Sequence, residues 1–290
     1  MERVTRREFA RSLAGVAAGL AAAPRAFGAT ADKIKPSIVG GIEIGVQSYT
    51  YRAFSVDRMI ESMRSVGLSS VELWTGHLDP AKHTEGDFET VRGKLDAAGI
   101  RTSAYCVNFK PDAGDDLLDK AFRGAGLLGT SLMTTSTEKS IVPKLDEWAQ
   151  KYKVTIGIHN HWFGDAWFKG DRSQNFESPE DYMGALKGRS NHVAINLDIG
   201  HFSAAGHDPV AFFREHHDRI MSLHVKDRDK DATHSNRRFG QGATPITDVL
   251  KLAQQLKFKY AANIEWEEDE QEPTPGVKDS FEYVKRVLGG

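Results

Sequence analysis

The chain is poor in cysteine and carries no excess of positive charge, and both shortages narrow what the protein can be. Cys106 is the only cysteine among 290 residues, so the chain can form no intramolecular disulfide and no thiolate cluster for a metal. Lys and Arg number 38 against 40 Asp and Glu, which gives a formal net charge of −2. No global basic field is therefore available to attract nucleic acid. The apolar run RTSAYCV around Cys106 predicts a small buried side chain.

Glycine motifs for nucleotides, repeats and long apolar runs are also missing. No Gly-x-Gly-x-x-Gly turn follows the first expected strand, which removes the usual nucleotide signature of an open, doubly wound sheet. No domain linker, repeat or low-complexity tract follows residue 40. The apolar stretch at 12–24 is too short to span a bilayer permanently. The sequence thus predicts one globular domain without a permanent membrane span.

The first 31 residues are predicted to be an export signal outside the fold. Thr5-Arg6-Arg7-Glu8-Phe9-Ala10-Arg11 precedes the uncharged stretch 12–24, and small residues at 26–31 offer a cleavage site. The Arg-Arg-x-Phe core resembles a twin-arginine signal, which implies a periplasmic or secreted protein. An amphipathic N-terminal helix is the alternative. The mature part, 32–290, would carry 33 basic and 38 acidic residues and a net charge of −5.

Strand-like and helix-like patterns alternate along the rest of the chain. The expected strands are 42–48, 70–75, 101–107, 130–135, 154–160, 193–198, 220–226 and 260–265. The expected helices are 56–66, 87–98, 115–127, 140–152, 179–187, 209–216, 245–256 and 275–288. Eight such pairs in succession predict an α/β fold, a single-domain (β/α)8 TIM barrel. In that fold the loops that follow the strands form the active-site face.

Four apolar runs in the second half end in possible metal ligands. They read VTIGIHNH (154–161), VAINLDIGH (193–201), IMSLHVKD (220–227) and AANIEWE (261–267). Side chains alternate between the two faces of a strand, so each run has one apolar face and one small or polar face. Met221, Leu223 and Val225, for example, fall on the apolar face of the third run. Parallel strands of this pattern would direct four side chains at one point: His159, Asp198, His224 and Glu265.

The order of these segments resembles the xylose isomerase-like TIM-barrel superfamily. The matching pieces are His-Asn-His, Asp-Ile-Gly-His, His-Val-Lys-Asp, Gly-Gln-Gly and a final Glu, and the resemblance covers roughly 42–288. Within the superfamily the chain is similar to the sugar phosphate isomerase/epimerase group, which includes tagatose epimerases and inosose dehydratase. The resemblance implies one divalent cation on the four residues just named. It also implies substrate contacts from His201 and from Arg237 or Arg238, before Gly240-Gln241-Gly242.

One position departs from the family. Epimerases of this group usually carry Glu on the fifth strand, as metal ligand and acid/base, whereas this chain has His159. A proton relay between two carboxylates therefore cannot be assumed. Two imidazoles and two carboxylates favour Mn, Fe, Co, Ni or Zn over Ca or Mg. The cation would polarise a ketone or a vicinal hydroxyl pair and stabilise an enediolate.

Proton abstraction needs a base within reach of the substrate. His161, Lys226 and Glu265 lie on the expected inward face and are the candidates. Glu72, at the tip of the second strand, could position a substrate hydroxyl across the barrel. Trp162 could supply an apolar wall for a sugar ring. The acidic run 267–272 looks like exposed loop charge.

These features favour an exported, metal-dependent enzyme that acts on a sugar or keto-sugar. Isomerisation, epimerisation and β-elimination of a 3-keto-glycoside all remain open, and elimination is favoured if His159 has replaced the second acid/base carboxylate. Two alternatives stay beside this prediction: a sugar-binding barrel without turnover, and a three-zinc apurinic endonuclease, for which the third strand offers only Asn108 and no additional His ligand. We expect a small-molecule partner, no nucleic acid, and possible homo-oligomers.

Overall fold

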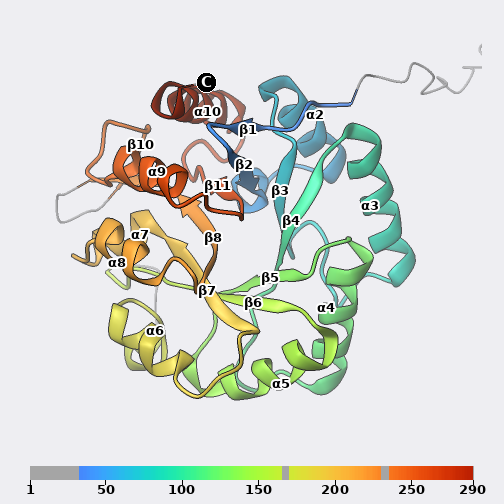
Figure 1. Cartoon of the computed structure of the whole chain (residues 1–290). Helices are drawn as coiled ribbons and strands as arrows, with labels where there is room; N and C mark the ends of the chain where they lie inside the picture. The colour runs from blue at the N-terminus through green and yellow to red at the C-terminus, as the bar shows by residue number, and fades with distance from the viewer. Residues whose placement is uncertain (1–32, 165–169, 230–234, 290) are drawn as a thin grey trace, which may run out of the picture. The chain divides into compact units, whose positions relative to one another are not determined.

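The computed structural model describes residues 33–164, 170–229 and 235–289, which belong to one compact unit, Lys33–Gly290. Its eight parallel strands form a closed barrel surrounded by helices, which confirms the predicted (β/α)8 TIM barrel (Figure 1). The predicted signal at 1–31 lies outside the described residues. Among the described residues, no helix combines the length and the apolar character needed to cross a membrane.

Each predicted strand is present within a few residues of its expected ends. The barrel strands are β2 (Ile42–Gln47), β3 (Ser70–Trp74), β4 (Arg101–Cys106), β5 (Leu132–Thr135), β6 (Thr155–His159), β7 (Val193–Asp198), β8 (Ile220–Val225) and β11 (Ala262–Ile264). Strand β2 pairs in parallel with both β3 and β11, and these two pairings close the barrel. The short β1 (Ile38–Val39) runs antiparallel to β2.

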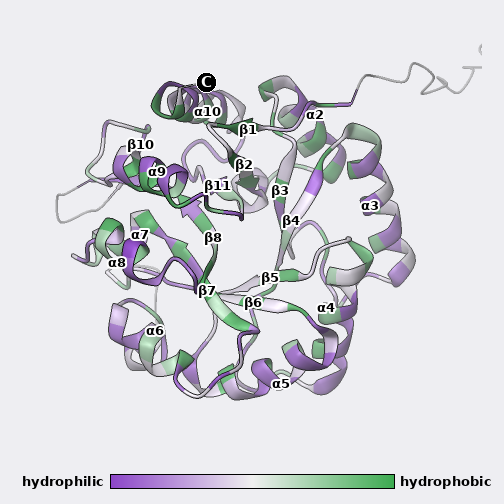
Figure 2. Ribbon diagram, viewed as in Figure 1, coloured by the Kyte–Doolittle hydropathy of each residue, from purple (hydrophilic) through white to green (hydrophobic). Residues whose placement is uncertain are grey.

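The outer helices follow the predicted pattern. They are α2 (Val56–Val66), α3 (Glu85–Ala98), α4 (Asp115–Leu127), α5 (Val142–Tyr152), α6 (Pro179–Leu186), α8 (Pro209–His216), α9 (Ile246–Gln255) and α10 (Thr274–Leu288). Thr84 and Ser178 cap α3 and α6 through capping boxes, and α2 ends at Gly67, whose φ of 90° suits a residue without a side chain. In Figure 2 the outer helices carry both apolar and polar residues, as expected for helices with one face on the barrel.

Short elements in the loops were not expected from the sequence. Helix α7 (Ile199–Ala204) begins directly after β7, with Asp198 as its N-cap. Strand β9 (Asp227–Arg228) pairs antiparallel with β10 (Asn236–Arg237). Three 3₁₀ turns complete the set: η1 (Ser48–Tyr51), η2 (Lys139–Ile141) and η3 (Arg172–Gln174). Elements this short leave almost no periodic signal in a sequence.

The alternation of faces holds with one exception. Outward-facing Ile156, Leu197 and Ile264 are buried in the core between strands and helices. Met221 was expected with them, but β7 pairs Ile195 with Ile220 and then Asn196 with Ser222, so a bulge skips Met221. Its Sδ lies 2.5 Å from the place where a Cβ on Gly157 would stand, so it fills space left by this glycine. The expectation that Met221 faces the helices was therefore wrong.

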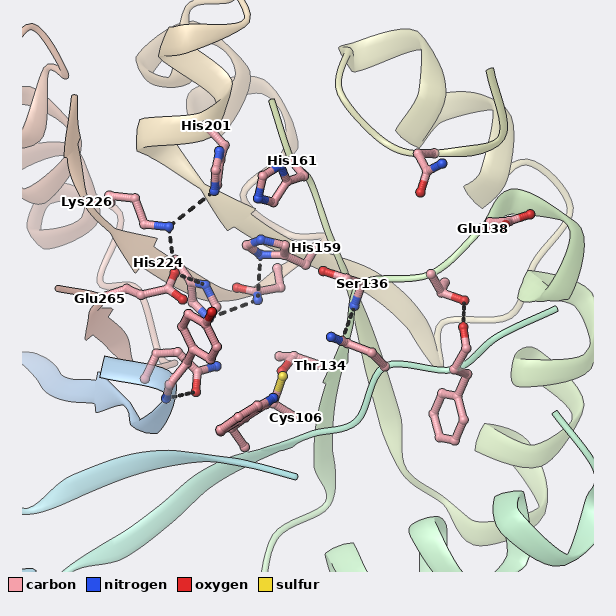
Figure 3. A pocket seen from close by; sticks show the side chains of 18 of the residues that line it. Cys106, Thr134, Ser136, Glu138, His159, His161, His201, His224, Lys226 and Glu265 are labelled. Carbon is pink, nitrogen blue, oxygen red and sulfur yellow. Dashed lines mark hydrogen bonds and ion pairs between the residues drawn. The ribbon is translucent and has the colours of Figure 1, made fainter. Parts of the chain in front are cut away.

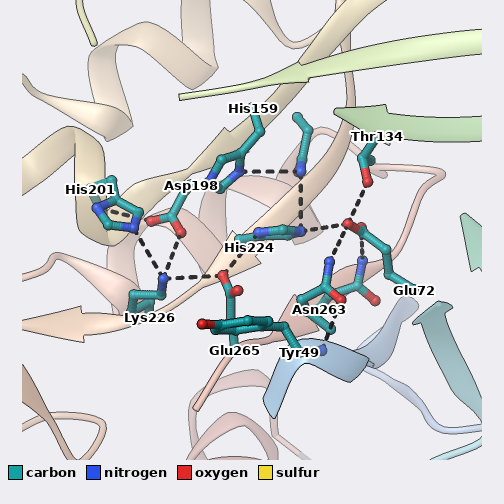
Figure 4. A network of polar contacts seen from close by, with 12 residues as sticks. Tyr49, Glu72, Thr134, His159, Asp198, His201, His224, Lys226, Asn263 and Glu265 are labelled. Carbon is teal, nitrogen blue, oxygen red and sulfur yellow. Dashed lines mark hydrogen bonds and ion pairs between the residues drawn. The ribbon is translucent and has the colours of Figure 1, made fainter. Parts of the chain in front are cut away.

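Polar side chains fill part of the barrel interior. Ser222 Oγ and Asn263 Nδ2 lie 3.2 Å apart, and both donate to Glu72. Gly45 makes room for Asn263, because a Cβ there would stand 2.3 Å from Asn263 Oδ1. Buried polar groups of this kind are stable only when they are hydrogen-bonded to one another. This network lies beneath the strand ends where the site forms (Figure 4).

Candidate active site

The C-terminal ends of neighbouring strands bring three predicted ligands together. Potential ligand atoms of His159, Asp198 and His224 all lie within 4.8 Å of one another. The strand register produces this proximity, because Asp198 is paired with His224 across β7 and β8. Glu265 follows β11, where its N–H donates to Val225 O at 3.0 Å and holds it beside β8. Its Oε2 lies 3.0 Å from His224 Nδ1 (Figure 4).

Three buried polar atoms of this cluster have no partner in hydrogen-bonding geometry among the described residues. They are Asp198 Oδ2, His224 Nδ1 and Glu265 Oε2, which lie 3.0–3.3 Å from oppositely charged side chains of the same cluster. Buried polar atoms without hydrogen bonds are rare in proteins, and a bound cation commonly accounts for them. Two imidazole nitrogens and two carboxylates would neutralise a divalent charge and suit a transition metal. The residues present therefore fit a divalent metal ion.

Lys226 lies among the same carboxylates. Its side chain is 2% exposed, and Nζ is 3.3 Å from Asp198 Oδ2, 3.1 Å from Glu265 Oε2 and 3.2 Å from Glu267 Oε2. Burial alone would lower its pKa, but the three carboxylates outweigh burial and raise the pKa, so the ammonium form is held. The sequence pattern predicted exposed loop charge at Glu267; the structure places this residue at the pocket, paired with Lys226.

Glu72 holds His224 from below. The Glu72 side chain is fully buried, and Oε1 accepts from Gln47 Nε2 and Thr134 Oγ1 at 2.6 Å each and from His224 Nε2 at 2.9 Å. Because Nε2–H is committed to Glu72, Nδ1 is the nitrogen that faces the site. Burial would lower the His224 pKa, but Glu72 and Glu265 raise it well above its usual range. Glu72 thus orients His224 rather than a substrate hydroxyl.

Two asparagines that were not predicted support the ligand residues. Asn196 Nδ2 lies 3.1 Å from His224 Nε2 and 3.4 Å from His159 Nδ1, between the two rings. Asn160 Oδ1 accepts from the N–H of Asp198, and its Nδ2 donates to the Asp198 carbonyl at 3.0 Å. The only sequence signal for Asn160 is its place inside the His-Asn-His run. Because side chains alternate along a strand, Asn160 falls on the face opposite His159 and His161.

His161 and His201 lie side by side next to the ligand cluster, with ring centroids 3.7 Å apart and ring planes tilted by 38°. His161 Nδ1 contacts Trp162 O at 2.8 Å and must donate to it, so Nε2 is the acceptor nitrogen of the neutral ring. Burial lowers the His161 pKa to about 3 and the His159 pKa to about 4, and it lowers the His201 pKa well below its usual range. All three rings are therefore neutral near pH 7 in the metal-free protein.

A pocket of about 510 Å³ opens above these residues (Figure 3). His159, His161, His201, His224, Lys226 and Glu265 line it. Cys106 also lines it and is only partly buried, which corrects the expectation of a small buried side chain.

The structure separates the remaining predicted substrate contacts from this pocket. Glu72, Trp162, Arg237 and Arg238 are not among the described residues that line it. Arg237 pairs with Asp229, and Arg238 pairs with Asp279 of α10. Arg228 lines the pocket instead, with its guanidinium carbon 5.9 Å from the centre of the Trp162 ring. Its position three residues after the end of β8 was the available signal.

Comparisons with known proteins agree with this fold. A family model described as xylose isomerase-like TIM barrel matches residues 139–287. A search of curated proteins gives no significant match.

Solved structures share the fold at low sequence identity. L-ribulose 3-epimerase has a TM-score of 0.67 at 14% identity, covering 86% of this chain and 95% of that one. The IOLI protein with a bound zinc atom has a TM-score of 0.65 at 16% identity, with coverages of 85% and 98%. The probable 3-DHS dehydratase AsbF of petrobactin synthesis, from Bacillus anthracis, has a TM-score of 0.65 at 14% identity, with coverages of 86% and 99%.

Proposed function

The chain belongs to the xylose isomerase-like TIM-barrel family, and from this premise we propose that it is a metal-dependent enzyme that removes a proton next to the carbonyl of a keto-sugar. The observation that carries the proposal is the set of buried atoms without hydrogen bonds on Asp198, His224 and Glu265 at the base of the pocket. A divalent cation bound to these atoms would complete their coordination. Neighbours of the same fold include an epimerase, a zinc-binding protein and a dehydratase, in keeping with this chemistry.

His159, Asp198, His224 and Glu265 would hold the cation, which we propose to be Mn, Fe, Co, Ni or Zn. When bound, such an ion supplies Lewis-acid polarisation of a sugar carbonyl. Glu72 keeps the His224 imidazole in its orientation by accepting its Nε2–H, and Asn196 Nδ2 lies 3.4 Å from His159 Nδ1. Asn160 fixes the backbone that carries Asp198.

The protonation states divide the acid and base roles. Lys226 is held as an ammonium, so it donates to the oxygen on which negative charge develops. Lys226 and His224 keep the Glu265 pKa well below its usual range against the effect of burial, so this carboxylate is ionised and can accept a proton only as a weak base. His161 is neutral and is the second candidate base. Return of the proton on the other face gives epimerisation, and loss of a leaving group gives elimination.

The elimination outcome has its own support in the ligand set. A strand-end histidine, His159, stands where a second acid/base carboxylate would allow the two-sided proton transfer of an epimerase. Without a carboxylate at position 159, departure of a β-substituent from a 3-keto-glycoside would complete the reaction, with the abstracted proton passed to the leaving oxygen. Isomerisation and epimerisation are the alternative outcomes of the same first step.

We also propose that residues 1–31 direct export to the periplasm or the medium. The support is the Arg6-Arg7-x-Phe9 core followed by a modest apolar stretch. A reporter fused to residues 1–35 should leave the cytoplasm, and its Arg6→Lys, Arg7→Lys form should not. A fusion that stays inside wild-type cells would contradict export.

The central test uses metal-reconstituted protein with free ketoses and 3-keto-glycosides in heavy water. We expect deuterium at a carbon beside the carbonyl, and Asp198→Asn should abolish it with metal binding. Glu265→Gln and His161→Gln, measured separately, identify the base. Sugar binding without exchange, in the presence of bound metal, would contradict catalysis and leave a binding protein.

A further inference from the structure

The pocket extends well beyond the proposed metal ligands. Its second lobe is formed by the segment after β4 and the segment after β5, and Asn108, Lys110, Ser136 and Glu138 line it. Figure 3 shows Glu138 and Lys226 at opposite ends of the pocket. We propose that this lobe binds a second, uncharged glycosyl ring, so that the substrate is a glycosylated keto-sugar. This inference rests on the proposed function for the first ring.

The second lobe is built before any ligand arrives. Asn108 Oδ1 accepts from the N–H of Ser136 at 2.8 Å, which joins the two segments. Thr137 Oγ1 donates to the Phe109 carbonyl at 2.7 Å and joins them again one residue further on. A lobe fixed in this way does not lose the conformational entropy of ordering its loops when a ligand binds.

The chemistry of the lobe suits hydroxyl groups. Glu138 offers a partly buried carboxylate that has no hydrogen bond or ion pair within the described part of the chain. Asn108 uses its carbonyl oxygen on Ser136 and retains an amide donor. Phe109, Pro111 and Phe163 supply the apolar part of the lining. Mixed acceptor, donor and apolar groups match the hydroxyls and C–H faces of a sugar ring.

Size and charge both favour a ring over a phosphate. A volume of about 510 Å³ lies in the range that encloses drug-sized ligands, roughly 300–1,000 Å³, which exceeds the needs of one sugar ring. A phosphate would require several cationic or N–H donors. Among the described residues of this lobe, the charged groups are the Glu138 carboxylate and the exposed Lys110. Removal of the Glu138 charge should therefore weaken the binding of a glycosyl ring and strengthen the binding of a phosphate.

The test is calorimetric binding to the metal-reconstituted full protein, with fructose, fructose 6-phosphate, turanose, lactulose and isomaltulose. The last three carry a glycosyl ring on different fructose hydroxyls. We expect at least one of them to bind about tenfold or more tightly than fructose, since a charge-assisted hydrogen bond and ring contacts are added. Glu138→Gln should reduce this advantage several-fold and leave fructose binding unchanged. Glu147→Gln, on the exposed face of α5, is the matched control.

A second variant guards against loss of folding. Ser136 has no side-chain hydrogen bond within the described residues, so Ser136→Phe should fold while its ring fills the lobe. It should abolish the disaccharide advantage and keep fructose binding.

The outcomes separate this inference from the proposed function. Deuterium exchange into a ketose without tighter binding of any disaccharide would overturn the second-ring site and leave the proposed function standing. A disaccharide advantage that depends on Glu138, without exchange, would support the site while the proposed catalysis fails. Tighter binding of fructose 6-phosphate in Glu138→Gln, with no disaccharide advantage, would identify a phosphate site and overturn the inference, as would the absence of binding by all five sugars.

Discussion

Replacement of Glu72 by Gln tests whether the buried carboxylate orients the metal ligand His224. The change keeps the shape of the side chain but replaces one acceptor oxygen with an NH₂ donor. Oε1 accepts three hydrogen bonds and Oε2 accepts two, from Ser222 Oγ and Asn263 Nδ2 at 3.1 Å each. Either orientation of the new amide therefore sets its NH₂ against at least one N–H donor, of Gln47 and His224 or of Asn263.

The cost in stability follows from these contacts. A hydrogen bond to a charged group contributes about 1.5–3 kcal/mol, and a buried donor left without a partner costs about 1–3 kcal/mol. We expect the free energy of unfolding of metal-free Glu72→Gln to fall by roughly 2–4 kcal/mol, because the hydroxyls can turn and recover part of the loss. Thermal unfolding should then occur about 5–15 °C lower for a domain of this size.

The effect on metal binding shows whether Glu72 orients the His224 ring or only stabilises the barrel interior. Without the charged acceptor, the His224 ring loses the partner that fixes Nε2–H and turns Nδ1 to the site. Loss of such a partner typically weakens metal affinity about 10–100-fold. We therefore expect Glu72→Gln to bind zinc about 10–100-fold more weakly than the parent protein does.

The assay is zinc titration against a chromophoric chelator, with urea denaturation of the same samples. Glu89→Gln, an exposed change of the same kind on α3, should alter stability by less than about 0.5 kcal/mol and leave zinc affinity unchanged. A Glu72→Gln protein that is less stable yet binds zinc with parental affinity would refute the orienting role and leave Glu72 as a support of the barrel interior.

Three further predictions concern the metal cluster itself. Zinc at about 100 times its Kd should raise the free energy of unfolding by about 2.7 kcal/mol. Thermal scans should show no such gain when a chelator is added or when Asp198 is replaced by Asn. Identical thermal scans with and without zinc would contradict a metal site. Lys226→Met should bind zinc about tenfold more tightly in chelator competition, because the ammonium 3.3 Å from Asp198 Oδ2 competes with a cation; weaker binding would contradict this. In the metal-free protein, the free energy of unfolding should fall as pH drops from 6.5 toward about 4. His159 and His161 should each contribute roughly 1.4 kcal/mol per pH unit, because their rings become protonated in the unfolded chain but stay neutral in the folded protein. Urea denaturation across this range should show a slope smaller by about 1.4 kcal/mol per pH unit for His161→Gln, and an unchanged slope would refute the assignment.

Local pattern was enough to predict the elements of the barrel. Helices 56–66, 115–127 and 209–216 were predicted at their observed bounds, because apolar periodicity, a cap or proline at the start and a glycine near the end are all local signals. Alternation along β7 and β8 likewise predicted that Asp198 and His224 face the same side. A side chain's direction from a strand depends only on its position in that strand.

The chain alone thus determined the barrel, its strand ends and the candidate ligands, since each depends on residues adjacent in sequence. Only the tertiary structure decided that Glu72 lies under His224 and that Lys226 reaches Asp198, Glu265 and Glu267. These contacts join distant segments, and their lengths depend on closure of β2 against β11, on bulges such as the one beside Met221, and on the reach of long side chains. No local pattern encodes those distances, because they arise from packing of the whole barrel.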